Sequence, residues 1–515
     1  APRFGPLSAW DAALFFPALG AELGVVVGAV ARRAPRRAST APIATAAAVV
    51  LLGVHAATFA SNSFTMWEDR ITLALLGAVL LARAISGYSA PTTRLQQQMP
   101  LLALGALVLV RIAATSRVCR EEQAPYCVPS FYARTARADG RFAENPAYAY
   151  AGPATNSPWM SGVAYVVALV VPNLLYRMLS TSQSQHGTAT TFLTWVLRPS
   201  MMLGAAYWLA DWAHGLDTID ESARAWLLAL KQCAGLTDVV LVGVLGTAFW
   251  LWAPLPISAR HQLERVSILG FGNSFGSAMV LLVALVFALL FLLAQPTGQV
   301  ALALCFLAIV VLAELGDNER DTQLIRAALV REAAGGSVAP RPVLPTLLES
   351  VTLALLGWVA FFATGHQATF AAIQWRVAFV GFTTVTYPWS PLWVVLNAFG
   401  PLVVLPAFGV VLLALWNVAP HRDRSEEAPA PPMTLAASLL RATTGFLLAH
   451  AVLALSAAAF ACFFRRHLML FKIWVPRFMT GALALLLADV AVLLAVGAAW
   501  RISGKVHRIF ASRFT

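Results

Sequence analysis

A short basic link near the C-terminus holds the residues best suited to chemistry with an anion. Its charged residues are Arg465, Arg466, His467, Lys472 and Arg477. Arginine forks bind phosphate through two parallel hydrogen bonds, and lysine supplies a point charge. Trp474 stands among them, as tryptophan does at the depth of lipid headgroups. We therefore predict that 465–477 contacts a phosphate-bearing molecule. The alternative is that these cations only snorkel at a membrane boundary.

A second link, 364–390, mixes hydrogen-bonding and aromatic side chains. Its candidate lipid-binding residues are His366, Gln367, Gln374, Trp375 and Arg376. Gly365 permits a sharp turn out of the preceding apolar segment. Donors set among aromatic rings suit the interface of a membrane. We predict that 364–382 contacts lipid, and the alternative is an ordinary interfacial connector.

Three polar residues fall within apolar segments: Asn273, Asn397 and Asp489. An ionised group at the centre of a bilayer costs roughly 2.5–3.5 kcal/mol on insertion scales, so such groups have a purpose. For the two asparagines we predict hydrogen bonds between helices. For Asp489 we favour a buried structural partner over contact with a substrate.

Patterns typical of catalytic or metal centres are missing. The chain has no HExxH and no pair of CxxC motifs, and its nine histidines are scattered. His55 and His450 fall inside apolar segments, where hydrogen bonding between helices is the favoured role. We therefore predict no catalytic residue and no metal ligand in this chain.

The composition places the chain in a membrane. Hydrophobic residues make up 59% of the 515 residues and charged residues only 12%, with a mean hydropathy of +0.72. A soluble domain carries about 25% charged residues. The net charge of +12 lies mainly in the links, which indicates contact with anionic membrane lipids and not with nucleic acid. We predict an all-α fold, a polytopic bundle of membrane helices.

Hydropathy over windows of roughly 19 residues predicts about thirteen transmembrane helices, of which the third and fourth are short enough to form one re-entrant pair. The predicted spans are 12–30, 42–59, 71–86, 99–114, 161–179, 191–210, 236–253, 272–294, 300–315, 344–363, 391–416, 434–464 and 480–500. The predicted divisions are a lumenal stub (1–11), a multi-pass membrane domain (12–500) and a basic cytoplasmic tail (501–515). Because the chain starts at Ala1 without an initiator methionine, we expect a longer protein.

Basic residues predict the orientation of the spans. The cluster Arg32, Arg33, Arg36 and Arg37 follows the first span, so that link is predicted to be cytoplasmic. Alternation then places 61–70, 115–160 and 465–477 together on the outer or lumenal side. A basic link on that side departs from the usual bias, which strengthens the prediction that it binds something anionic.

The cysteines agree with this orientation. Cys119 and Cys127 share the polar 115–160 link on the predicted oxidising side, so we predict a disulfide between them. The alternative is two unpaired thiols. Cys233, Cys305 and Cys462 lie at or within spans, where a thiol behaves as a small hydrophobe.

Two sequence strings resemble the membrane domain of a known family. They are FFATGHQATFAAIQWRVAFVGF (361–382) and RRHLMLFKIWVPRFM (465–479), and they resemble the type 3 family of GPI ethanolamine phosphate transferases. Shorter strings follow in family order: SNSFTMWED (61–69), CREEQ (119–123), GFGNSFGS (270–277), QPTGQ (295–299) and LAELGD (312–317). The resemblance covers nearly the whole chain.

The resemblance implies transfer of phosphoethanolamine from phosphatidylethanolamine to the third mannose of a GPI glycolipid precursor, at the lumenal face of the endoplasmic reticulum membrane. In that family a metal-dependent domain, similar to alkaline phosphatase, precedes the membrane spans. A divalent metal, zinc, is therefore expected in that missing domain, and no catalytic residue transfers to this chain. The resemblance also implies a small hydrophobic stabilising subunit.

Two other protein classes remain open at this point. A secondary transporter would show repeat symmetry between its halves and paired charges at the midplane. A lipid-linked glycosyltransferase would use acidic residues in an early lumenal link, and Glu68 with Asp69 is such a pair.

Overall fold

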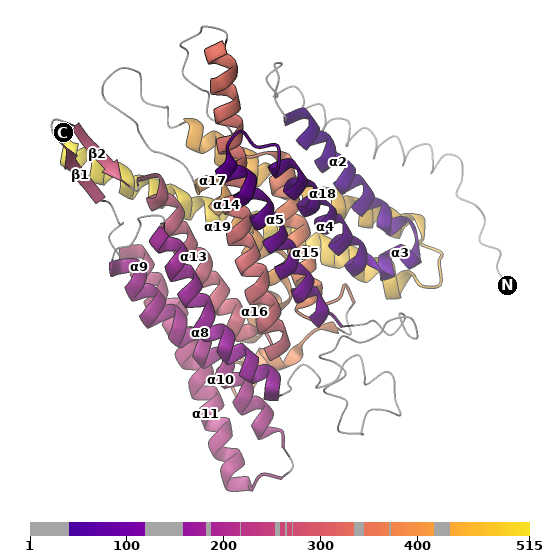
Figure 1. The fold of residues 1–515 in the computed structure, drawn as a ribbon. Helices are drawn as coiled ribbons and strands as arrows, with labels where there is room; N and C mark the ends of the chain where they lie inside the picture. Colours follow the sequence, from indigo (N-terminus) through magenta and orange to yellow (C-terminus); the bar gives the residue numbers. More distant parts are fainter. Residues whose placement is uncertain are drawn as a thin grey trace.

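A computed structural model describes residues 41–118, 158–181, 187–216, 218–252, 258–262, 265–269, 271–333, 344–369, 372–416 and 433–514. Within these ranges the chain forms a bundle of long helices that pack side by side (Figure 1). A two-stranded antiparallel hairpin, which pairs Ser258 with Leu269, accompanies them. The predicted all-α membrane bundle is therefore confirmed in its main feature, and this hairpin is the exception to it.

The first half of the described chain supplies the outer helices. Its elements are α2 (Ala41–Ala57), η1 (Thr58–Ala60), α3 (Asn62–Met66), α4 (Glu68–Gly87), α5 (Thr93–Ala113), η2 (Ala114–Ser116), α8 (Pro158–Thr181), α9 (Gly187–Phe192), η6 (Leu193–Leu197), α10 (Arg198–His214), α11 (Glu221–Val240), η7 (Leu241–Gly246), α12 (Thr247–Trp252), β1 (Ser258–Gln262) and β2 (Arg265–Leu269).

The second half supplies the centre of the bundle and the two longest C-terminal helices. Its elements are α13 (Phe271–Leu293), α14 (Pro296–Ala333), α15 (Leu347–Ala363), η9 (Trp375–Phe379), α16 (Trp389–Phe399), η10 (Gly400–Val404), α17 (Leu405–Leu415), α18 (Met433–Phe463), η11 (Leu470–Trp474) and α19 (Val475–Phe514).

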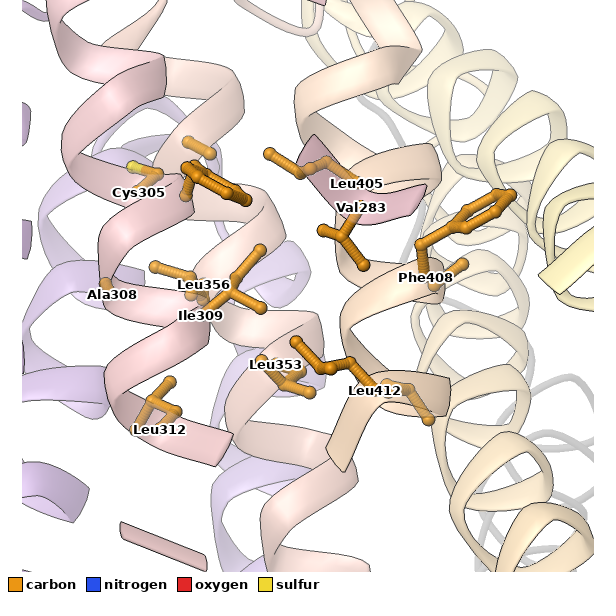
Figure 2. Packing of buried hydrophobic residues seen from close by; sticks show 14 of the residues in the cluster. Val283, Cys305, Ala308, Ile309, Leu312, Leu353, Leu356, Leu405, Phe408 and Leu412 are labelled. Carbon is orange, nitrogen blue, oxygen red and sulfur yellow. The ribbon is translucent and has the colours of Figure 1, made fainter. Parts of the chain in front are cut away.

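Helices α13, α14, α15 and α17 form the core. Figure 2 shows Val283, Ile309, Leu356 and Phe408, one from each helix, packed together. In the most apolar 18 residues of each span, the buried share is 72% for Pro296–Arg326 and 83% for Trp389–Leu415, but only 33% for Leu470–Lys505. The outer helices thus keep a wide apolar face for lipid, as expected of a bundle that a bilayer surrounds.

The predicted number of spans is only partly supported. Within the described ranges nine helices are long and apolar enough to cross a membrane, and two shorter apolar helices cover Ala44–Ala60 and Leu347–Ala363. The predicted span 191–210 falls in α9, η6 and α10, which are not among the nine. The predicted span 12–30 lies outside the described residues. Helices α4 and α5 are each of membrane length, so the re-entrant pair is not seen.

The links predicted to share one side do meet at one end of the bundle. We call it the link end, and it comprises the described parts of 58–70, 114–118, 364–380 and 464–477. Ser116 donates a 2.9 Å hydrogen bond to the Ala363 carbonyl, and the Trp474 indole donates one of 3.0 Å to the Phe59 carbonyl. The compartment that this end faces stays a prediction.

The opposite end carries its own polar contacts. Arg83 of α4 makes a two-pronged ion pair with Glu319 of α14, at 2.7 and 2.8 Å. Arg501 of the C-terminal helix donates to the Leu251 carbonyl at 3.3 Å. The predicted cytoplasmic tail therefore begins at the end of the bundle away from the link end.

Replacing Gly357 by alanine should lower the melting temperature of the protein. A Cβ at this position of α15 would collide with the Leu402 carbonyl oxygen, and backbone cannot yield as a side chain does. Overpacking of this kind costs roughly 1–3 kcal/mol. The control is Gly53→Ala in α2, where a new Cβ meets nothing within 4 Å. Equal melting temperatures for the two variants would contradict this packing.

Candidate functional site

A buried ion pair joins the last helix to the first described ones at the link end. The Arg477 guanidinium donates from Nε to Oε2 of Glu68 and from Nη2 to Oε1, each at 2.8 Å. His55 Nε2 lies 2.9 Å from Glu68 Oε1. All three side chains are at least 99% buried. Helices α2, α4 and α19 are thereby connected through one carboxylate.

Aromatic rings enclose the guanidinium of Arg477. Its central carbon lies 4.0 Å from the ring centroid of Trp358 and 4.4 Å from that of Phe59. Gly481, one turn further along α19, leaves the room that the Nη1 atom occupies, because an added Cβ would lie 3.2 Å from it. Bidentate pairing and ring stacking are the two contacts for which arginine is suited and lysine is not.

A second ion pair borders a small recess beside the first. Arg117 Nη1 lies 2.6 Å from Asp69 Oδ2, and Gln367 Nε2 donates to the Val118 carbonyl at 2.6 Å. The recess is lined by Thr65, Met66, Glu68, Asp69, Arg117, Val118, Phe362 and Gln367. Asp69 Oδ1 is buried and has no hydrogen-bond partner among the described residues. The recess therefore presents both signs of charge within a few side chains.

His366 is buried, and the hydrogen bonds of its two ring nitrogens hold the turn after α15 in place. Its Nε2 lies 2.8 Å from Asn397 Oδ1, which can only accept, so Nε2 carries the proton. Nδ1 then accepts from the Thr364 hydroxyl at 3.0 Å. Gly365 has a φ of +87°, which favours glycine, and it lets the chain turn back into the bundle. Burial lowers the pKa of His366 to about 4, so the ring is neutral at pH 7.

The other predicted residues of the 364–382 segment divide between the interior and the surface. Gln374 Nε2 donates to the Thr364 carbonyl at 3.0 Å, which secures the turn. Trp375 is exposed, and the exposed Arg376 lies 3.5 Å from Asp211 of α10. His366 and Gln374 thus hold the segment in shape, while Trp375 and Arg376 are the side chains it presents outward.

The predicted basic cluster is divided in the same way. Arg465, Arg466 and Lys472 are exposed at the link end, and His467 is half-buried with its ring 4.9 Å from that of Trp474. Trp474 and Arg477 are 2% and 1% exposed. We expected both to lie at headgroup depth, but the structure places them inside the bundle. Burial and pairing with Glu68 leave Arg477 no access to an anion at the surface.

The intramembrane residues have different surroundings. Asn397 bridges His366 and the Leu293 carbonyl, to which Nδ2 donates at 2.8 Å, as predicted for a link between helices. Asp489 was expected to have a buried partner, but it is exposed on the outer face of α19.

Asn273 lies in α13, and its side chain is outside the described part. Cys119 and Cys127 also lie outside it, so their disulfide stays a prediction.

Sequence patterns missed the central pairing. Glu68 was noticed only as half of an acidic pair, and His55 as a residue that bonds between helices. The available signal was that Glu68 and Arg477 carry opposite charges in two links on the same predicted side. Asp238, fully buried in α11, was missed as well. It lies against α10, because a Cβ on Gly204 would be 3.5 Å from its Oδ2.

The glycosyltransferase alternative loses its support here. Both of its candidate carboxylates are engaged, Glu68 by Arg477 and His55, and Asp69 by Arg117. Both oxygens of Glu68 are engaged, whereas Asp69 pairs through Oδ2 and keeps Oδ1 without a partner among the described residues. Among the described residues no group of three or more histidine, cysteine, aspartate or glutamate side chains could hold a metal ion.

Arg477→Met should destabilise the protein strongly, because it leaves Glu68 charged and buried beside an apolar side chain. Removing one partner of a buried ion pair costs roughly 3–5 kcal/mol. The double variant Glu68→Gln with Arg477→Met should recover much of that loss in melting temperature. Arg465→Gln, at an exposed position of the same link, is the control and should change stability by no more than about 0.5 kcal/mol. Additive effects of the two single changes would argue against the pair.

Stability should fall as the pH is lowered from about 6.5 towards about 4 because of His366. The unfolded chain binds a proton on this ring in that range and the folded chain does not, so acid favours unfolding. The loss should be on the order of 3 kcal/mol. Melting temperatures of His366→Gln, measured across this range, should fall less steeply than those of the wild type. An unchanged slope in His366→Gln would contradict this role of the ring.

Comparison with curated proteins reveals relatives over most of this chain. Among them, GPI ethanolamine phosphate transferase 3 of Saccharomyces cerevisiae is 26% identical over 86% of this chain and 43% of its own length. The protein of that name from Eremothecium gossypii is 27% identical over 90% of this chain and 45% of its length. The human GPI ethanolamine phosphate transferase 3, catalytic subunit, is 26% identical over 90% of this chain and 49% of its length.

No family model and no solved structure matches the chain. The chain spans about half of the length of the curated relatives. These relatives confirm the resemblance predicted from the sequence: this chain is similar, over nearly its whole length, to the C-terminal part of proteins named GPI ethanolamine phosphate transferase 3.

Proposed function

We propose that this chain is the membrane half of a transferase that moves phosphoethanolamine from phosphatidylethanolamine to the third mannose of a GPI precursor. The names of its relatives support the reaction, and their greater length supports a chemical step carried out by a further domain. The divalent metal expected for such a domain, zinc, then belongs to that domain. This chain holds lipid substrates beneath it and anchors it to the endoplasmic reticulum membrane.

The observation that carries this proposal is the gathering of four separate links at one end of the bundle. Arg465, Arg466 and Arg376 are exposed there, together with Trp375. Cations of this kind suit the phosphate of a lipid headgroup, and an exposed tryptophan suits the interfacial depth at which headgroups lie. In this proposal the link end faces the lumen.

The recess at the link end adds a second contact for the same substrate. Phosphatidylethanolamine has a zwitterionic headgroup, with an anionic phosphate and a cationic amine. Arg117 and Asp69 carry the complementary charges and lie 2.6 Å apart. A headgroup at the mouth of the recess would exchange this pair for one salt bridge to each of its own charges. Holding both lipid substrates at one place supplies the positioning on which a transfer step depends.

A small hydrophobic subunit is part of the proposal as well, since the outer helices leave wide apolar faces. The buried pair of Glu68 and Arg477 has a different role. It holds α19 against α4, and so keeps the preceding link with its exposed cations at the same end of the bundle as the recess.

In the full-length enzyme, Arg465→Gln with Arg466→Gln should raise the apparent KM for phosphatidylethanolamine about tenfold or more. A hydrogen bond to a charged group contributes roughly 1.5–3 kcal/mol, and two such bonds would be lost. The kcat and the melting temperature should change little, because both side chains are exposed.

The matched control is Arg501→Gln with Arg508→Gln, which removes the same charge at the far end of α19. Its KM should stay at the wild-type value. The proposal fails if the link variant is folded and its KM is unchanged, or if both variants raise the KM equally.

A further inference from the structure

The outer face of α19 carries a carboxylate at mid-depth. Asp489 lies near the centre of the apolar stretch Leu470–Lys505 and is exposed. Its neighbours on this face are large and exposed too: Leu486 60%, Val490 48% and Leu493 72%. The opposite face of the helix packs into the bundle through small residues, including Ala484, Ala488 and Ala495. Asp489 therefore points away from the rest of the described chain.

A carboxylate in this place is costly when it faces hydrocarbon. The aspartate side chain is short, and each end of the stretch is on the order of 20 Å away along the helix, so the group cannot snorkel to water. Polar groups inside membranes pair with each other or with backbone carbonyls. No described residue pairs with Asp489. The Asp489 carboxylate therefore needs a partner that comes from outside the described chain.

Two candidate binding partners for the outer face of α19 fit poorly. The predicted span 12–30 has no lysine, arginine or histidine and brings a carboxylate of its own, Glu22. A second copy of this chain would sit in the membrane with the same orientation. A symmetric contact through this face would then bring the two Asp489 side chains to the same depth, with like charges opposed.

We propose that this face binds a transmembrane helix of another protein that presents a basic side chain at the depth of Asp489. The ion pair would neutralise both charges, and it would fix the depth and rotation of the incoming helix. Small residues at the same face permit close approach: Ala482 and Gly497 are exposed, and a Cβ on Gly497 would meet nothing within 4 Å. This surface lies away from the link end and does not depend on the proposed transfer.

Photo-crosslinking in cells that express the full-length protein tests the proposal. A benzoylphenylalanine at Leu486 or Leu493 should crosslink to one discrete protein that has a basic residue within a membrane span. The same probe at Trp226, which is 75% exposed on α11, is the control for a different face and should not give that product. Asp489→Leu should reduce the product about tenfold or more, because a desolvated ion pair is lost. Asp489→Lys should abolish the product, and an acidic residue at the basic position of the partner should restore it.

Loss of the crosslink in Asp489→Leu can be distinguished from unfolding by the melting temperature. This substitution makes an outward face more apolar and should leave the melting temperature unchanged. A clear fall in melting temperature would show that Asp489 has a partner within its own chain and would overturn the proposal. The proposal is also overturned if the probes crosslink only to lipid, to a second copy of this chain, or to a protein with no basic residue in its membrane spans. A product that persists in Asp489→Leu, or that the charge exchange fails to restore, would also overturn it.

Discussion

The pairing of Glu68 with Arg477 is the constraint around which the link end is built. Two charges are removed from water here, and their attraction offsets that cost only because the geometry is bidentate and aromatic rings cover the guanidinium. Since the two residues are far apart in sequence, the contact fixes α19 against α4. His55 adds α2 to the same carboxylate. Small shifts of these helices would leave a buried charge unpaired, so the arrangement has little freedom.

This constraint divides the polar residues of the links into two groups. Those that turn inward, such as His366, Gln374, Trp474 and Arg477, set the shape of the link end. Those that remain outside, such as Arg465, Arg466 and Trp375, are then held at defined places on a rigid support. Under the proposed function, such a support fixes where two lipid headgroups lie relative to a separate chemical centre, and the rate of transfer depends on that placement.

Much of the architecture could be predicted because it depends on local composition. Runs of apolar residues predicted most of the helices, and their alternation correctly predicted which links meet at one end. Asn397 also matched its prediction, since a polar residue within a span needs a partner wherever it lies. Boundaries were less accurate: α14 and α19 continue well beyond the predicted spans, because helices do not end where hydropathy falls.

The failures concern residues whose surroundings depend on distant parts of the chain. Arg477 looked like one cation among five in a basic link, and nothing in its neighbourhood shows that a carboxylate from the first helices reaches it. Asp489 looked like a residue with an internal partner, and only the packing of α19 shows which way it faces. Charge patterns place a residue along the membrane normal, but its direction around the helix follows from tertiary contacts.

The central claim is that the link end faces the lumen while the tail of α19 faces the cytoplasm. Labelling with a membrane-impermeant thiol reagent in sealed microsomes tests it most directly, on Leu468→Cys and Arg508→Cys in a background without reactive native cysteines. Leu468 is 90% exposed and Arg508 is exposed, so either thiol can react. The account predicts that Arg508→Cys is labelled in intact microsomes, and Leu468→Cys only after permeabilisation. Labelling of Leu468→Cys in intact microsomes would contradict it.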